Sequence, residues 1–417
     1  MQEGEWLIKL TEWRYWSIPF VAGFIGWMTN WVAIKMMFYP MEFWGWKPFN
    51  LKLGWQGVIP SKAEKMAKVV VRTGLQSLAS VQEVYDQLDK KTLANSFLEA
   101  MERRLEEYID DVMLRENQVV WDNLPLTIKK RIYEQLRKEL PNIIDSLIND
   151  TTKNIESLFD LEDMVVKKLT QNKHLLNQIF QEAGDKEFKF IINSGFYFGF
   201  LFGLLQLAVW IEYPMGWILP TFGFIGGIKA NWLALKIIFS PLEPIKIGPF
   251  TLQGLFLKRQ KEVARVLCRI TTEEIITMNN MLHNMLTGPR SERTNMLMHQ
   301  RISHAVDSVT SKIGFGLGRP MLQTILGLKG YASLKNVAKH SALHFANEEV
   351  CSNQNFSDGQ KEIVNQLLRS RMEALSSREF RDVLRPAFEE DEWTLILVGG
   401  MLGLLTGIMH YFVTFGL

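Results

Sequence analysis

The chain has 417 residues, of which 47% are hydrophobic, and its formal net charge is +2. A chain of this length has room for two or three domains, and a nearly neutral charge gives no general preference for nucleic acid or acidic partners. Two cysteines, Cys268 and Cys351, lie far apart in the sequence. They form no disulfide framework and no CxxC motif, which is typical of proteins in a reducing compartment.

Four apolar segments are long enough to cross a bilayer, which takes about 20 apolar residues. They are residues 15–38, 190–211, 215–239 and 393–415. The first segment carries Asn30 and Lys35 and has no small-residue cleavage site after it. We therefore interpret it as a membrane span and not as a cleaved signal peptide.

A charged stretch, 60–187, follows the first span, and a second one, 258–391, follows the third. In the first stretch apolar residues recur at helical spacing until Pro141 interrupts the pattern. These apolar residues are Phe97, Met101, Leu105, Ile109, Val112, Ile128, Ile132, Leu136 and Leu140. Their modest stripes predict helices that either form bundles or lie on a membrane surface.

The second and fourth spans each contain three glycines spaced four residues apart. They are Gly195, Gly199 and Gly203 in one span and Gly399, Gly403 and Gly407 in the other. Glycines at this spacing share one helix face and let another backbone approach closely. We interpret all six as helix-packing positions.

The first and third spans share a motif, GFIGWMTNWVAIK at 23–35 and GFIGGIKANWLALK at 223–236. Each copy runs into a Phe-x-Pro sequence, a Gln-Gly step and a basic amphipathic helix. Together with the two glycine-bearing spans, the shared motif predicts two repeats, about 1–213 and 214–417. Each repeat consists of a span, a long insert and a second span.

The predicted fold is an all-α membrane protein with four transmembrane helices in two internal repeats, each with a long helical cytoplasmic insert. The predicted parts are a first span (1–59), insert 1 (60–187), a hairpin of spans two and three (188–257), insert 2 (258–391) and a fourth span (392–417). The link at 212–214 has no basic residue, whereas the opposite ends of the spans are rich in Lys and Arg. This asymmetry predicts cytoplasmic inserts and termini outside.

Polar residues inside the spans are the candidate functional site. They are Asn30, Lys35, Gln206, Lys229, Asn231, Lys236 and His410. Lys229 stands out because a charge at mid-bilayer costs about 2.5–3.5 kcal/mol and needs a partner or water. The asparagines could line a polar site at the repeat interface or hydrogen-bond between helices related by the pseudo-twofold axis. Lys35 and Lys236, near the span ends, could reach the membrane surface.

A weak metal motif lies in the second insert. His340, His344 and Glu348 are spaced i, i+4 and i+8, so a helix would place them on one face with ligand types that suit zinc. Because no HExxH motif and no fourth ligand accompany them, we interpret them as a solvated face. No nucleophile with a base and no paired carboxylates are found, so we expect no cofactor and no enzymatic activity.

The sequence resembles the YheB/YjiN-like family of bacterial membrane proteins along essentially its whole length. The resemblance rests on GFIGWMTNWVAIKMMFYP (23–40) with QGVIP (56–60), SGFYFGFLFGLLQ (194–206), GLFLKRQKEVA (254–264) and EFRDVLRPAFEEDEW (379–393). It implies the bacterial inner membrane and this topology, and it assigns no reaction. The family repeats Thr-Asn in the second copy, where this chain has Lys229-Ala230-Asn231.

Two functions compete. The first is a non-enzymatic inner-membrane protein whose two helical arms contact lipid or envelope proteins in a scaffold or lipid-handling role, because basic helices directly follow the membrane. The second is a transporter or channel for an anionic solute, with the intramembrane polar residues as its site. Membrane lipid, and a second copy or an envelope protein, are the expected partners, and nucleic acid is not.

Overall fold

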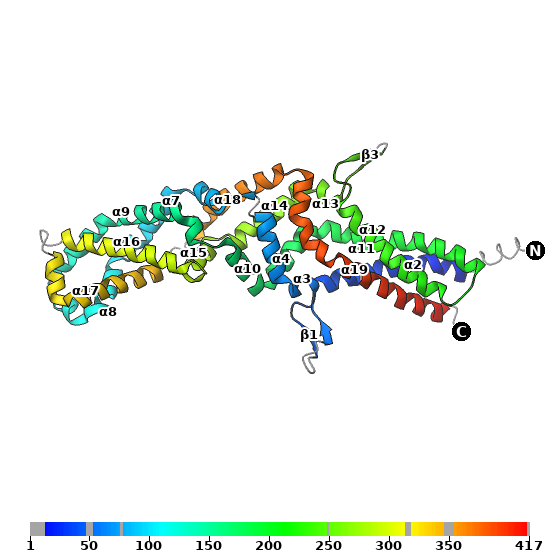
Figure 1. Cartoon of the computed structure of the whole chain (residues 1–417), viewed down its shortest axis with the longest axis horizontal. Helices are drawn as coiled ribbons and strands as arrows, with labels where there is room; N and C mark the ends of the chain where they lie inside the picture. The colour runs from blue at the N-terminus through cyan, green and yellow to red at the C-terminus, as the bar shows by residue number, and fades with distance from the viewer. Residues whose placement is uncertain are drawn as a thin grey trace, which may run out of the picture. The chain divides into compact units, whose positions relative to one another are not determined.

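A computed structural model describes residues 13–46, 53–75, 78–247, 250–312, 318–345 and 354–414 (Figure 1). The chain divides into two compact units that are each discontinuous in sequence. Unit 1 comprises residues 1–75, 166–267 and 371–417, and unit 2 comprises residues 76–165 and 268–370. Three helices contain a unit boundary: α10 (Leu161–Gln171), α14 (Gln260–Ile270) and α18 (Gln354–Ala374).

Unit 1 holds four helices that are long and apolar enough to cross a membrane. They are α2 (Trp13–Phe38), α11 (Lys173–Glu212), α12 (Ile218–Phe239) and α19 (Ser377–Thr414). Helices α11 and α19 have 40 and 38 residues, or nearly 60 Å at 1.5 Å per residue, about twice the thickness of a bilayer core. Each therefore continues well beyond its apolar part, and each begins at a capping residue, Asn172 or Ser376.

Helix α2 packs along α11, and α12 packs along α19. The glycines lie where the backbones come closest. A methyl group on Gly195 would overlap the carbonyl oxygen of Gly26, and one on Gly403 would overlap that of Gly223. The other four glycines at this spacing face the partner helix of their pair in the same way. The helix backbones in each pair thus touch directly at these glycines.

Short elements follow the ends of α2 and α12 and include the only β-strands in the described residues. After α2 come β1 (Trp44–Trp46), β2 (Leu53–Trp55), α3 (Val58–Ser61), α4 (Ala63–Val69) and the π-helix η2 (Val70–Leu75). After α12 come β3 (Ile245–Ile247), β4 (Phe250–Leu252) and α13 (Leu255–Lys258), and then α14. Each strand pair is an antiparallel hairpin, so the all-α expectation is wrong at these two places.

Matching hydrogen bonds close the base of each hairpin. The N–H of Gly57 donates to the carbonyl of Pro40 (2.9 Å), and the N–H of Gly254 donates to that of Pro241 (3.0 Å). The Gln56 side chain likewise donates to the carbonyl of Met41, at 2.7 Å. The Gln-Gly steps of the sequence therefore tie each hairpin back to the chain directly after a membrane helix.

Unit 2 is built from helices of both inserts. They are α6 (Val81–Gln87), α7 (Lys90–Arg103), α8 (Leu105–Asp122), α9 (Leu126–Leu158), η3 (Thr271–Ile275), α15 (Met278–Thr287), α16 (Ser291–Lys312) and α17 (Gly318–Phe345). One hydrophobic cluster contains residues of both, such as Leu105 and Ile144 from the first insert and Ile302 and Leu334 from the second. The inserts therefore share a core and do not form two separate arms.

The sequence predicts that Pro141 interrupts the helix. In the structure, α9 continues through Pro141 to Leu158. A proline inside a helix costs about 3 kcal/mol. Its neighbours Leu140 and Ile144 are buried in the shared core, and this packing offsets the cost.

Candidate functional site

The structure divides the intramembrane polar residues into a buried group and an exposed group. Asn30, Gln206, Asn231 and His410 are all at most 8% exposed. The side chain of Asn30 donates to the carbonyl of Ile191 on α11, at 2.7 Å. This bond joins the two spans within the first half of the chain, and not the helices α2 and α12 that the pseudo-twofold axis would relate.

Glycines provide the space for both asparagines. A methyl group on Gly195 would lie 2.6 Å from the amide nitrogen of Asn30, and one on Gly399 would overlap the amide of Asn231. The first glycine of each spaced set therefore accommodates a buried amide as well as a neighbouring backbone.

A small cavity of about 50 Å³ lies among the four membrane helices. Asn30, Gln206 and His410 line it, together with Thr29 and several glycines. Gln206 reaches across its wall and donates to the carbonyl of Leu219 at 3.4 Å. Since a single water needs roughly 10–15 Å³ of such space, this cavity has room for a few water molecules or a small ion.

The three lysines lie elsewhere. Lys35, Lys229 and Lys236 are exposed on the outside of the helices. Their ammonium groups lie over aromatic rings, Lys35 above Tyr39 at 5.6 Å and Lys236 above Trp232 at 4.7 Å. Lys229 also lies near the Trp232 ring, at 5.8 Å. The seven predicted site residues therefore do not form one site.

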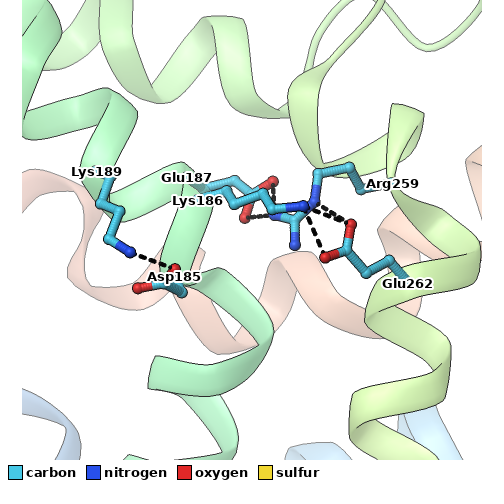
Figure 2. Close-up of polar contacts among 6 residues, drawn as sticks. All are labelled: Asp185, Lys186, Glu187, Lys189, Arg259 and Glu262. Atoms are coloured by element: carbon cyan, nitrogen blue, oxygen red, sulfur yellow. Dashed lines mark hydrogen bonds and ion pairs between the residues drawn. The ribbon is translucent and has the colours of Figure 1, made fainter.

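An ion-pair cluster joins α11 to the short helices after α12 (Figure 2). Nη1 of Arg259 donates to both carboxylate oxygens of Glu187, at 2.7 and 2.6 Å, although Glu187 is only 3% exposed. Nε of Arg259 donates to Glu262 at 2.9 Å, and Nζ of Lys186 donates to the same carboxylate at 2.8 Å. Hydrogen bonds from Arg259 and Lys186 lower the pKa of Glu262 to about 2.

Each carboxylate in this cluster is neutralised by a cation, so none is poised as a general acid or base. The neighbouring pair in Figure 2, Lys189 with Asp185 at 2.8 Å, lies on the surface of α11 alone. The cluster therefore connects α11 to α13 and α14. Arg259 is one of the basic residues that flank the spans in the sequence, and no local pattern pairs it with Glu187.

Unit 2 contains a much larger cavity, with a volume of about 500 Å³. Its wall follows one face of α9 from Ile128 to Thr151, a distance of about 35 Å along a helix. Helices α7, α8, α15, α16 and α17 supply the other walls. The lining is almost entirely aliphatic and aromatic, and it includes the methionines Met101, Met113, Met278, Met281, Met285 and Met298.

Two of the hydroxyl groups at this wall are engaged with the protein. The Tyr108 hydroxyl donates to the carbonyl of Ala338 at 2.6 Å, and burial raises the pKa of Tyr108. The Thr310 hydroxyl lies 2.9 Å from that of Tyr331. The cavity therefore presents hydrocarbon along its length, and one exposed cation, Arg131, belongs to its lining.

The apolar residues at helical spacing in the first insert indicate one wall of this cavity. Their spacing predicts one helix face for Ile128, Ile132, Leu136 and Leu140, and all four line the cavity. A periodic apolar face predicts burial, and it does not say whether the space opposite is filled.

The histidines of the weak metal motif are both exposed on α17, and Glu348 lies outside the described residues. Within the described part of the chain, no three His, Cys, Asp or Glu side chains are grouped so that they could hold a metal ion.

Comparison with known proteins gives partial matches. No family model matches the chain, and no solved structure matches it. Two proteins of Staphylococcus epidermidis, from different strains and both described as UPF0754 membrane protein, are 36% identical over 94 residues. The match covers 21% of this chain and 24% of each relative, so the chain spans about a quarter of the length of the curated relatives it matches. Over that part the chain is similar to an uncharacterised membrane protein, and its four apolar helices are consistent with a membrane protein.

Proposed function

We propose that this chain is a non-enzymatic, lipid-handling membrane protein whose unit 2 accommodates the acyl chain of a membrane lipid. The observation that supports this most is the cavity of about 500 Å³ in unit 2. Pockets for small molecules span roughly 300–1,000 Å³ and have mostly apolar linings. A hydrocarbon lining that extends along about 35 Å of helix suits an extended chain better than a compact solute.

The chemistry of the lining favours an apolar occupant. Apolar cavities bind hydrocarbon ligands, and an acyl chain in contact with these side chains would remove apolar surface from water.

The methionines favour an adaptable ligand site. A methionine side chain is unbranched and polarisable, and it fills irregular space and tolerates ligands of different shape. Six methionines in one lining suit acyl chains that differ in length and unsaturation.

Photocrosslinking in membranes tests the proposal. The full chain is reconstituted in vesicles of phosphatidylethanolamine and phosphatidylglycerol that contain a trace of phosphatidylglycerol with a diazirine on its acyl chain. We expect crosslinks on cavity residues of α9, α15 and α16 in addition to the membrane helices. Crosslinks confined to the membrane helices would overturn the proposal.

Filling the cavity provides the matched comparison. Ala305 and Ala342 line the cavity, so Ala305→Phe with Ala342→Phe places two rings in it. We expect a severalfold loss of crosslinks in unit 2, whereas the crosslinks in the membrane helices should remain unchanged. Met296→Phe serves as the control because Met296 is 73% exposed. Equal unit 2 crosslinking in the filled and control variants would contradict the acyl-chain site.

A second candidate, transport of a small ion, is supported by the cavity of about 50 Å³ and the polar side chains in its lining. Its site would be Asn30, Gln206 and His410, without the outward-facing lysines. Proton flux into proteoliposomes loaded with a pH-sensitive dye should then fall when His410 is replaced by leucine. Flux equal to that of empty vesicles would remove this candidate.

The membrane and topology belong to the same proposal. We place the chain in the bacterial inner membrane as a member of the YheB/YjiN-like family, with unit 2 on the cytoplasmic side and both termini outside. The two halves would be internal repeats. The paired hairpins and paired glycine contacts support this, and so do the basic residues that flank the spans on one side.

A further inference from the structure

The hairpin β1–β2 carries two tryptophans that are among the most exposed large hydrophobic residues in the described chain. Trp44 is 79% exposed and Trp46 is 76% exposed. They are two residues apart on one strand, so both project from the same face. Two neighbouring indoles that both face water are unfavourable on a soluble surface. The hairpin begins six residues after a membrane helix ends at Phe38.

The direction of this face follows from the strand register. Trp44 pairs with Trp55 across the hairpin, and directly opposed residues point to the same side. The indole N–H of Trp55 donates to the carbonyl of Met36 in the last turn of α2, at 3.2 Å. The tryptophan face is therefore the side of the hairpin that is attached to the end of the membrane helix.

The opposite face of the hairpin is closed. Gly45 pairs with Gly54, so that face has no side chains at its centre. The Phe43 ring covers it, with its Cζ 2.8 Å from the place of a methyl group on Gly54. The hairpin thus has one free apolar face, made by Trp44 and Trp46.

The second hairpin also exposes apolar side chains, here aliphatic ones. Ile245 and Leu252 are paired across it and are 50% and 47% exposed. Its base is likewise fixed directly after a membrane helix, through Gly254 and Pro241. The same feature at the ends of two spans indicates a role connected with the bilayer.

We propose that both hairpins are interfacial anchors, with Trp44 and Trp46 inserted into the boundary between lipid headgroups and acyl chains at the leaflet where α2 ends. Amphipathic aromatic rings concentrate at this depth in membranes. Lys35, exposed on α2 and stacked on Tyr39, marks the same level. The anchors hold the ends of α2 and α12 at a constant depth, and they act independently of the cavity in unit 2.

Fluorine NMR of the full chain in lipid nanodiscs tests the insertion. The protein is labelled with 5-fluorotryptophan, and the signals of Trp44 and Trp46 are assigned with the single variants Trp44→Phe and Trp46→Phe. We expect severalfold stronger broadening of both signals from lipids spin-labelled high on the acyl chain than from a water-soluble gadolinium chelate. The buried Trp210 sets the level for a side chain that is closed off from water.

Stronger broadening of Trp44 and Trp46 by the soluble chelate than by the lipid label would overturn the anchor. The measurement is made on the wild-type fold, so it does not depend on the stability of a disruptive variant. A failed crosslinking test of the unit 2 cavity would leave this result unaffected.

Discussion

At the scale of single residues, the membrane unit depends on places where a side chain is absent. Gly195 and Gly399 each face a carbonyl of the neighbouring helix and also make room for a buried asparagine. Without the glycines, the amide of Asn30 could not reach Ile191 at 2.7 Å. A polar group in the membrane interior must be satisfied within the protein. Each buried asparagine therefore depends on the glycine that makes room for it.

Replacing Gly195 with alanine should destabilise the protein by about 1–3 kcal/mol, because the new methyl group overlaps backbone atoms that cannot move independently. Thermal unfolding in detergent measures the change as a lower midpoint. Gly226→Ala is the matched control, since its methyl group would lie 3.8 Å from the nearest atom, Cβ of Phe202. Equal midpoints for the two variants would contradict this role of Gly195.

Glu262 should make stability depend on pH in the acid range. Its pKa is about 2 in the folded protein and about 4.5 without its partners, so its contribution is complete above pH 4.5. As the pH falls from 4.5 to 2 the unfolded state binds the proton first, and the contribution is lost. The stability difference between wild type and Glu262→Gln should therefore be constant from pH 5 to 7 and vanish near pH 2. A difference that persists at pH 2 in thermal unfolding would refute the assignment.

At the scale of elements, the long helix α11 is joined to α13 and α14 by the cluster of Figure 2. The Arg259 side chain is 18% exposed and the Glu187 side chain 3% exposed, so both charges are largely removed from water. A buried ion pair offers little net stability over an apolar pair of the same size, but removing one partner leaves a buried charge uncompensated. The joint should therefore be sensitive to single changes and tolerant of a matched double change.

Replacing Glu187 with glutamine should lower the unfolding free energy by about 1.5–3 kcal/mol, because Arg259 loses its buried partner and keeps only the partly exposed Glu262. The double variant Glu187→Leu with Arg259→Met should recover most of that loss. Denaturant unfolding of all three proteins in detergent gives the comparison. If the double variant were less stable than the single one, the pair would have a role other than neutralisation.

In the whole molecule, the two inserts build one hydrophobic core together. Leu105 and Ile144 from the first insert and Ile302 and Leu334 from the second lie in one cluster. The cavity is likewise lined from both inserts. Each half of the chain therefore supplies one part of unit 2, and separation of the halves would expose apolar surface on both.

The fragment 60–187 alone should consequently behave as an expanded helical state. We expect helical circular dichroism, binding of an apolar dye and no cooperative unfolding transition. Mixing it with fragment 258–391 should restore cooperativity and release the dye. A cooperative transition in the single fragment would show that the first insert folds without the second.

The four apolar spans, the helical inserts and the glycine faces could be predicted from the sequence, because hydrophobic length and periodicity are local properties of the chain. It did not reveal the two hairpins, whose strands have three residues each and are too short for a periodic signal. It also grouped Lys229 with Asn30, since it could place residues on a span but not on a particular side of the bundle.

The segments that share a core, and the space between them that stays open, depend on contacts between distant parts of the chain. Residues of the two inserts that meet in unit 2 are far apart in the sequence, as Tyr108 and Ala338 show with a separation of 230 positions, and no local pattern encodes such a pairing. The cavity is a property of helices at a distance from one another, and the same apolar stripes could have closed around a filled core. The Glu187–Arg259 pair was hidden for the same reason, because it depends on where α11 passes α13.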